Sequence, residues 1–321
     1  MRRVAMARTQ RFLLLAVGLW LGLAAAAPAW ADGLARFKKS IEPQIPAGAL
    51  TYKSARALGD NGFILEGVVV TPPPTDKDSK EKPQPIAIKT VTVEALDFDA
   101  IENNKPPLFA KLHFDGITTG SNVGGAFDLK QLTGLDKVSA DFRLDYKLAG
   151  DTKTFTLNQL ELNLNGLAKL DTSLVLNGVG ADVAAKPDTA MDDASLKTAD
   201  FVYDDHSLLA KVVPIVAVLQ GSDPKALIAL ATTQLDIARA GQGPAAQKAI
   251  DSLVAFLEDY QKPKGPLHIT LNPPDKVTNA QLSDAKTADE VVKLLGVEVS
   301  YAGTRQSKPA ELTTDPPPKK D

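Results

Sequence analysis

The chain has 321 residues, with 36 Lys or Arg against 39 Asp or Glu, and it contains no cysteine. A chain without cysteine forms no disulfide, no thiolate metal site and no thiol nucleophile, and it carries no lipid on a cysteine. Its formal net charge of −3 lacks the basic excess of a nucleic-acid-binding surface, so the composition argues against a nucleic-acid partner.

The first 31 residues have the three-part pattern of a secretory signal peptide. Four arginines and no acidic residue precede the apolar stretch from Phe12 to Ala26, and Ala29-Trp30-Ala31 offers the small residues that a signal peptidase reads. The apolar stretch is short for a membrane span. We therefore expect cleavage after Ala31, a periplasmic or secreted protein with 32 basic and 39 acidic residues, and no integral membrane span after cleavage.

The next part of the chain opens with a short predicted helix over residues 33–43, which Pro43 would end. Turn-forming residues at 59–62 separate two apolar runs, residues 50–58 and 63–71, and this pattern predicts a β-hairpin. Residues 72–85 are rich in Pro, Lys and Asp and carry almost nothing apolar, so they are predicted to form a mobile loop.

Two strands are predicted next, over residues 86–98 and 108–117. In the first, Val91 and Val93 should share one face. The opposite face is then expected to carry Ile86, Ile88, Leu96 and Phe98. The Gly-rich stretch 116–125 is expected to end the second strand.

Residues 137–148 show the most regular alternation in the chain, because every odd position is polar. Every even position is apolar: Val138, Ala140, Phe142, Leu144, Tyr146 and Leu148. One dry face and one wet face are typical of an antiparallel strand. At about 3.3 Å per residue this strand would be roughly 40 Å long, about twice the usual length.

Three further predicted strands complete a meander with residues 137–148. Apolar residues alternate in one phase up to Leu157 and in the other from Leu160 to Leu164, so the slip at Asn158-Gln159 indicates a β-bulge that curves the sheet. Asn165-Gly166 predicts a turn with positive φ. The last two strands, residues 167–179 and 196–203, are expected on either side of a loop at 187–193.

From residue 204 the apolar period becomes helical. A first helix is expected after a cap at Asp204 or Asp205, with a kink at Pro214. A second should begin at Ser222-Asp223-Pro224, and a third at Gly243-Pro244. Residues 267–271 and 297–301 read as strands, and capping boxes at Thr278 and Thr287 each predict a short helix between them.

These elements predict one α+β domain over residues 32–302: a long-stranded, curved antiparallel β-meander packed against a C-terminal helical block, with short returning strands. The strand block covers residues 49–203, the helix block 204–262 and the returning strands 265–302. The returning strands are expected in the same sheet, because two short strands are not stable alone. Residues 303–321 are polar and proline-rich, and they predict a disordered tail.

Few residues in the sequence have a pattern that suggests catalysis. The sequence has no nucleophile elbow, zinc-binding helix, phosphate loop or calcium loop. Asp204-Asp205-His206 places a carboxylate beside an imidazole, which suits either proton transfer or a helix cap. Asp97, Asp99 and Glu102 could bind a divalent cation or simply mark a solvated strand end. We favour the structural interpretation for both groups and expect no catalytic residue, no metal and no cofactor.

The helices predicted within residues 207–219 and 224–239 are more aliphatic than one buried stripe requires. They could form a central core, or they could line a groove for an acyl chain together with the long strands, because such sites need shape and aliphatic lining rather than fixed polar groups. On the second interpretation, the predicted ligand-binding residues are Phe142, Leu144, Leu162, Leu174, Leu209, Val213 and Val216.

The segment from Leu50 to Val179 resembles exported bacterial envelope proteins of the AsmA and YdgA type. The resemblance lies in Tyr52, in residues 62–70 (Gly-Phe-Ile-Leu-Glu-Gly-Val-Val-Val), in residues 89–94 (Lys-Thr-Val-Thr-Val-Glu) and in residues 160–164 (Leu-Glu-Leu-Asn-Leu). It implies a β-rich, elongated, non-enzymatic envelope protein, tied in some relatives to lipid transport or membrane homeostasis. The helical block has no counterpart in that group.

Three functions are open at this point. The first is a non-enzymatic periplasmic protein that binds or carries an apolar or lipid ligand between sheet and helices. The second is an envelope structural or adaptor protein that acts through a protein partner. The third, a hydrolase using Asp205 and His206, is the least favoured.

Overall fold

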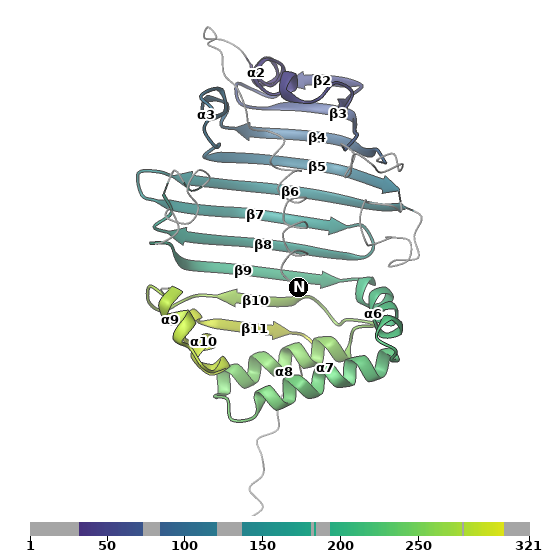
Figure 1. Cartoon of the computed structure of the whole chain (residues 1–321), viewed down its shortest axis with the longest axis vertical. Coiled ribbons are helices and arrows are strands. Elements are labelled where there is room, and N and C mark those ends of the chain that lie inside the picture. The colour runs from purple at the N-terminus through teal and green to yellow at the C-terminus, as the bar shows by residue number, and fades with distance from the viewer. Residues whose placement is uncertain are drawn as a thin grey trace, which may run out of the picture.

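The computed structural model describes residues 32–72, 84–120, 137–180, 183, 193–277 and 279–304. Every strand in these residues belongs to one 11-stranded antiparallel sheet, in which strand order follows chain order from β3 to β11 (Figure 1). This confirms the predicted α+β fold, with its long-stranded meander, C-terminal helices and returning strands. The predicted signal peptide lies outside the described residues, as do most of the loops at 72–85 and 187–193 and nearly all of the tail.

The strands are β1 (Leu50–Thr51), β2 (Ser54–Ala57), β3 (Phe63–Val70), β4 (Ile86–Leu96), β5 (Phe109–Gly120), β6 (Lys137–Ala149), β7 (Thr154–Leu164), β8 (Ala168–Asn177), β9 (Ser195–Asp205), β10 (Leu267–Leu271) and β11 (Val297–Tyr301). The helices are α2 (Gly33–Ser40), α3 (Phe98–Glu102), α6 (Leu208–Leu219), α7 (Pro224–Arg239), α8 (Pro244–Glu258), α9 (Asn279–Asp284) and α10 (Ala288–Leu295), with a 3₁₀ turn at Glu42–Gln44.

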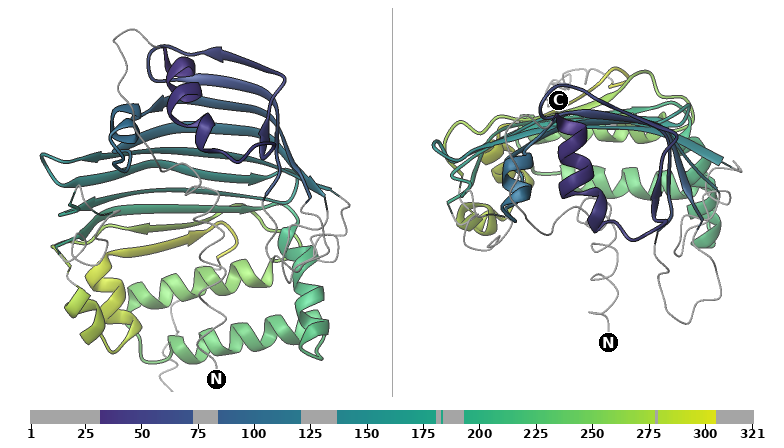
Figure 2. Two further views of the ribbon diagram at one scale, coloured as in Figure 1. Left: turned by 45° about the horizontal axis from the view of Figure 1, so that its top comes forward. Right: turned by 90° about the horizontal axis from the view of Figure 1, so that it is seen from above.

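The sheet is arched, and the helices lie on its concave side (Figure 2). Helices α2 and α3 lie at the end formed by β2 to β4, whereas α6 to α10 gather at the end formed by β9 to β11. The curvature agrees with register shifts in β6 to β9, one of which falls between Leu157 and Leu160. This position confirms the bulge predicted at Asn158-Gln159, since an extra residue in one strand increases the local bend and twist.

Two separate apolar cores form where helices cover the sheet. In the N-terminal core, Phe37 of α2 stacks on Phe63 with ring centroids 4.5 Å apart, and Phe98 of α3 lies 6.4 Å from Phe63. In the C-terminal core, Phe256 of α8 meets Tyr203 and Tyr301 edge to face, at 5.9 and 5.3 Å. Each core therefore joins the concave face of the sheet to a helix.

The predicted faces of β4 are wrong. Ile88, Val91, Val93 and Leu96 are all buried in the N-terminal core, on one face. A register shift between Val93 and Ala95 reverses the alternation once. The alternation of faces along β4 reverses a second time at Lys89. The residues beside Lys89 on the neighbouring strands are Gly67 of β3 and Gly116 of β5, and their φ angles are +60° and +63°. Left-handed glycine backbone at these positions keeps apolar side chains an odd number of residues apart on the same face.

Two further boundaries differ from the prediction. Phe98 does not extend β4 but begins α3, where Asp97 caps the helix and the Phe98 ring is buried. The glycines after residue 115 do not end β5, which continues through Gly116 to Gly120. The Gly116 N–H donates a hydrogen bond to the Asp141 carboxylate at 2.8 Å, so a side chain on β6 supports the strand at this glycine.

The predicted helix caps at Asp223 and Thr287 are confirmed. The Asp223 carboxylate accepts hydrogen bonds from two N–H groups at the start of α7, and Thr287 forms a full capping box with Glu290 before α10. The first helix differs in detail, because Ser207 occupies the N-cap position and the Asp205 carboxylate accepts the Leu209 N–H at 3.0 Å. Helix α6 continues through Pro214. The predicted box at Thr278 lies outside the described residues.

Candidate functional site

Cross-strand registers align side chains into rows on the concave face that are apolar except at Thr172. One row runs through Val91, Phe114, Phe142, Leu162, Leu170, Tyr203, Leu267 and Tyr301. Its neighbour runs through Val93, Leu112, Leu144, Leu160, Thr172, Phe201, Ile269 and Val299. Both rows end in the helix-covered cores, so the side chains between those ends also point to the concave side.

The middle of these rows belongs to neither core. We name as the apolar strip the concave-face side chains Phe142, Leu144, Leu160, Leu162, Leu170 and Leu174. All six are at least partly exposed, and Leu162 and Leu170 reach 38 % and 37 %. Four strand spacings of about 4.8 Å separate Phe114 from Tyr203, so the strip lies in a gap of about 19 Å between the two cores. Large apolar side chains on a concave face are usually covered, and an exposed patch of this kind marks an interaction site.

The structure brings together four of the seven predicted ligand-binding residues. Phe142, Leu144, Leu162 and Leu174 lie in the apolar strip on β6, β7 and β8. The other three are on α6, at the helix-covered end of the sheet, where Leu209 packs in the C-terminal core and Val213 is buried. Leu209 and Val213 therefore serve internal packing, whereas among the described residues the strip is an open surface of the sheet.

Sequence reasoning missed two members of the strip, Leu160 and Leu170. Both belong to runs whose alternation is visible in the sequence. Leu160 lies opposite the predicted residue Leu144, and Leu170 lies opposite the predicted residue Leu162. Register was the missing information, because alternation within a strand gives the face of a side chain but not its cross-strand partner.

The convex face of the same strands is polar and charged. Lys169 Nζ lies 2.7 Å from Glu161 Oε2, and Arg143 approaches the other oxygen of Glu161 at 3.8 Å. On β4 and β5, the hydrogen bond from Lys111 lowers the pKa of Glu94, whose carboxylate lies 2.6 Å from the lysine. The sheet is therefore amphipathic across its thickness, with its apolar side chains on the concave side.

Asp205 has a structural role at the junction of β9 and α6. Its Oδ2 accepts hydrogen bonds from the Tyr203 hydroxyl at 2.7 Å and from the Leu209 N–H, and its buried Oδ1 has no hydrogen-bond partner among the described residues. Burial, and then the hydrogen bond to Asp205, raise the pKa of Tyr203. His206 lies 3.8 Å from Asp204 instead. The hydrogen bond from Leu209 to Asp205 agrees with the helix-cap interpretation for Asp205.

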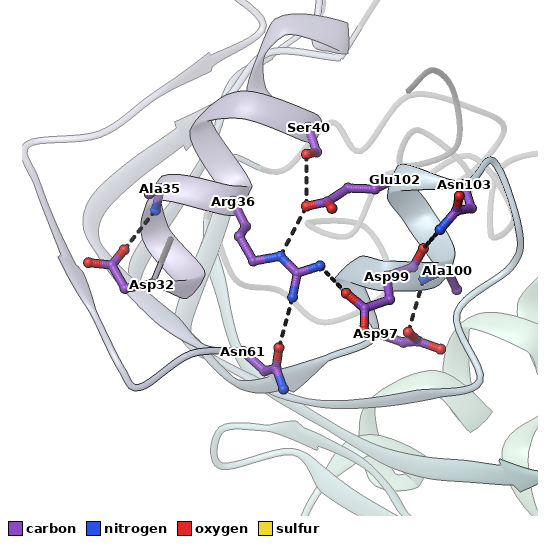
Figure 3. A network of polar contacts seen from close by, with 10 residues as sticks. All are labelled: Asp32, Ala35, Arg36, Ser40, Asn61, Asp97, Asp99, Ala100, Glu102 and Asn103. Atoms are coloured by element: carbon purple, nitrogen blue, oxygen red, sulfur yellow. Dashed lines mark hydrogen bonds and ion pairs between the residues drawn. The ribbon is translucent and has the colours of Figure 1, made fainter. Parts of the chain in front are cut away.

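The acidic group at Asp97, Asp99 and Glu102 joins α3 to α2 (Figure 3). Arg36 of α2 forms an ion pair with Asp99, and its Nε donates to Glu102 at 3.0 Å. Asp97 accepts the N–H groups of Ala100 and Leu108, each at 3.0 Å. These carboxylates bind protein donors, and no group of three or more metal-ligating side chains occurs in the described part of the chain.

Two open hollows lie away from the apolar strip, near α9 and α10. The first, of about 560 Å³, is lined largely by charged and polar residues that include Asp284, Glu290 and Lys293. The second, of about 550 Å³, lies between α10 and the outer strands, beside Thr270 and Val297. Both linings mix apolar side chains with charged and polar ones.

Comparisons with known proteins add one finding about the C-terminal half. The model of a family described as an uncharacterised protein matches residues 161–302, from β7 to the end of β11. The matched segment thus includes the end of β7, the whole of β8 and the whole helical block. The search of curated proteins found no match.

Proposed function

We propose that this is a non-enzymatic periplasmic protein that binds or carries an apolar ligand, with an acyl chain of a lipid lying along the apolar strip. The proposal rests on one observation: six large apolar side chains of β6 to β8 line the concave face between two helix-covered cores and are left partly exposed. An arched sheet with apolar side chains on its inner face supplies the shape and the lining that an alkyl chain needs.

The strength of such an interaction is adequate for reversible binding. Each methylene group that leaves water contributes about 0.8 kcal/mol, so ten methylenes contribute about 8 kcal/mol. Association costs about 4 kcal/mol or more for lost translational and rotational freedom. The remainder corresponds to weak, exchangeable binding, as expected of a carrier rather than a storage protein.

Titration with a fluorescent fatty acid tests the proposal. We expect Leu162→Asp to weaken binding of the probe at least tenfold, because a carboxylate in the strip disfavours an alkyl neighbour. Asn163→Asp is the matched control, since it adds the same charge one residue away on the opposite face of β7 and should bind the probe like the wild type. Native mass spectrometry of the protein purified from its host should show bound lipid.

Equal affinity of the wild type and Leu162→Asp for the probe would sink the proposal, as would equal loss in both variants with unchanged circular dichroism. The alternative function, an adaptor that acts through a protein partner, gives a different result. An adaptor would bind no fatty acid probe in either form, and its partner would be lost in Leu162→Asp only if that partner uses the concave face.

A further inference from the structure

Helices α6 and α7 form a bent, apolar pair, which we name the elbow (residues 208–239). Among the described residues no single helix is long and apolar enough to cross a membrane, but α6 and α7 together meet that criterion of length and composition, with a bend of 94° between them. The bend places the end of α6, at Val218 and Leu219, at the tip of the elbow.

The elbow carries the most exposed large apolar side chains of the described residues. Val218 is 74 % exposed and Leu219 is 79 % exposed, and on α7 Leu230 and Ile237 reach 57 % and 65 %. The other exposed large hydrophobic residues, which include Leu162 and Leu170, do not exceed 38 %. The large apolar side chains of the elbow are therefore far more exposed than those elsewhere on the described surface.

Packing of the fold does not require these side chains. None of the 16 residues of α7, all within the described part of the chain, is buried, whereas α8 buries six. Helix α7 is the outermost helix of the block and packs on α8 and α6 (Figure 1). Ala226, Leu230, Thr233 and Ile237 recur at spacings of four, three and four, so they form one outward stripe.

The charges of the elbow are few, and the exposed Asp236 lies beside the outward stripe of α7 rather than in it. Only five of residues 208–239 are charged. Arg239 is bound to Asp251 of α8 at 2.6 Å, and the Asp223 carboxylate is held by two N–H groups at the start of α7. Lys225 is exposed beside the tip, where a lysine can reach lipid phosphates while its stem stays in the apolar layer.

We propose that the elbow docks the protein on a lipid bilayer, with Val218 and Leu219 inserted in the interfacial layer and the outward stripe of α7 lying along it. An exposed aliphatic face with few charges and a flanking lysine is the pattern of a helix that binds in the membrane interface. The stripe has only two large side chains, too small a surface for the roughly 1,200 Å² of a stable dimer. The inference stands whether or not the apolar strip binds a ligand.

Flotation with vesicles of phosphatidylethanolamine and phosphatidylglycerol, mixed three to one, tests the docking. We expect the wild type to float with the vesicles and Val218→Asp/Leu219→Asp to lose at least fivefold of the bound fraction. The control is Thr51→Asp/Thr198→Asp, which adds the same two charges at exposed strand positions and should float like the wild type. Circular dichroism of all three proteins checks that they are folded.

A second readout uses the absence of cysteine from the sequence. Leu219→Cys and Thr198→Cys each create one labelling site for an environment-sensitive fluorophore. Vesicles should raise and blue-shift the emission of the label at 219 and leave the label at 198 unchanged.

Several outcomes would overturn the inference: a wild type that stays off the vesicles, a double variant that floats like the wild type, equal responses of the two labels, or a dimer that dissociates in the double variant without any vesicle binding. Failure here is distinguishable from failure of ligand binding. The double variant should still bind the fatty acid probe, and Leu162→Asp should still float.

Discussion

At the scale of single residues, Tyr146 of β6 lies at the edge of the N-terminal core. Its ring packs at the edge of that core, 5.9 Å from Phe155, and its hydroxyl donates a hydrogen bond to the carbonyl of Pro107 at 3.1 Å. Burial, with a smaller effect of Asp97, raises the pKa of Tyr146 to about 12. The native state therefore keeps a proton that the unfolded chain gives up near its ordinary pKa of about 10.

This raised pKa predicts how stability depends on pH. The contribution of Tyr146 is fully present below pH 10 and is lost as the pH rises from about 10 towards 12, by about 2 kcal/mol. Tyr146→Phe should lose about 1 kcal/mol at neutral pH through the missing hydrogen bond and should then show a shallower loss in alkali. Urea unfolding between pH 8 and 11.5 measures both effects. Some alkaline loss should persist in the variant, because burial also raises the pKa of Tyr203. Parallel curves for the two proteins would contradict the assignment, since the variant has no hydroxyl at position 146 to titrate.

At the scale of elements, α7 shows how a cap stabilises a helix in which no residue is fully buried. The Asp223 carboxylate accepts the N–H groups of Lys225 and Ala226 at 2.9 and 3.0 Å. Because α7 gains little from burial, the cap accounts for a large share of its order.

We predict that Asp223→Ala frays the first turn of α7 at a cost of about 1 kcal/mol. Hydrogen exchange should speed up for the N–H groups at the start of α7 while the rates in β6 to β8 stay the same. Asp236→Ala, in the last turn of the same helix, is the control and should leave the first turn protected. Equal exchange in both variants would show that α7 is held by packing alone.

Most elements could be predicted from the sequence because their signals are local. The alternation of residues 137–148 identifies β6, and Asp223 and Thr287 identify the starts of α7 and α10. The faces of β4 could not be predicted, since they depend on glycine conformations in neighbouring strands. The apolar strip could be predicted in part. Alternation gives the face of its side chains, but a strand's own sequence does not say whether a helix packs over that face.

At the scale of the whole molecule, the two cores lie at opposite ends of one sheet. Phe37 is buried in the N-terminal core and Phe256 in the C-terminal core, and the half-exposed strands β6 to β8 separate them. Side chains in different cores share no partners, so their effects on stability should be independent.

Substitution in both cores tests this arrangement. Phe37→Ala and Phe256→Ala should each lower the free energy of unfolding by about 3–5 kcal/mol, because each leaves a cavity under a helix. In the double variant the losses should add to within about 0.5 kcal/mol. Chemical denaturation of the four proteins gives the comparison, and a coupling well above that value would mean that the sheet transmits strain between its ends.

The order of the strands also bears on how the newly made chain reaches its native state. From β3 to β9 each strand pairs with the next along the chain, so every step closes only a hairpin or one connecting loop. The pairing of β9 with β10 is different, because residues 206–266 lie between the paired strands. Loop-closure entropy grows with the length of the closed segment. We therefore expect the strands from β3 to β9 to pair quickly during folding. The pairing of β10 with β9 should be the late and slow step.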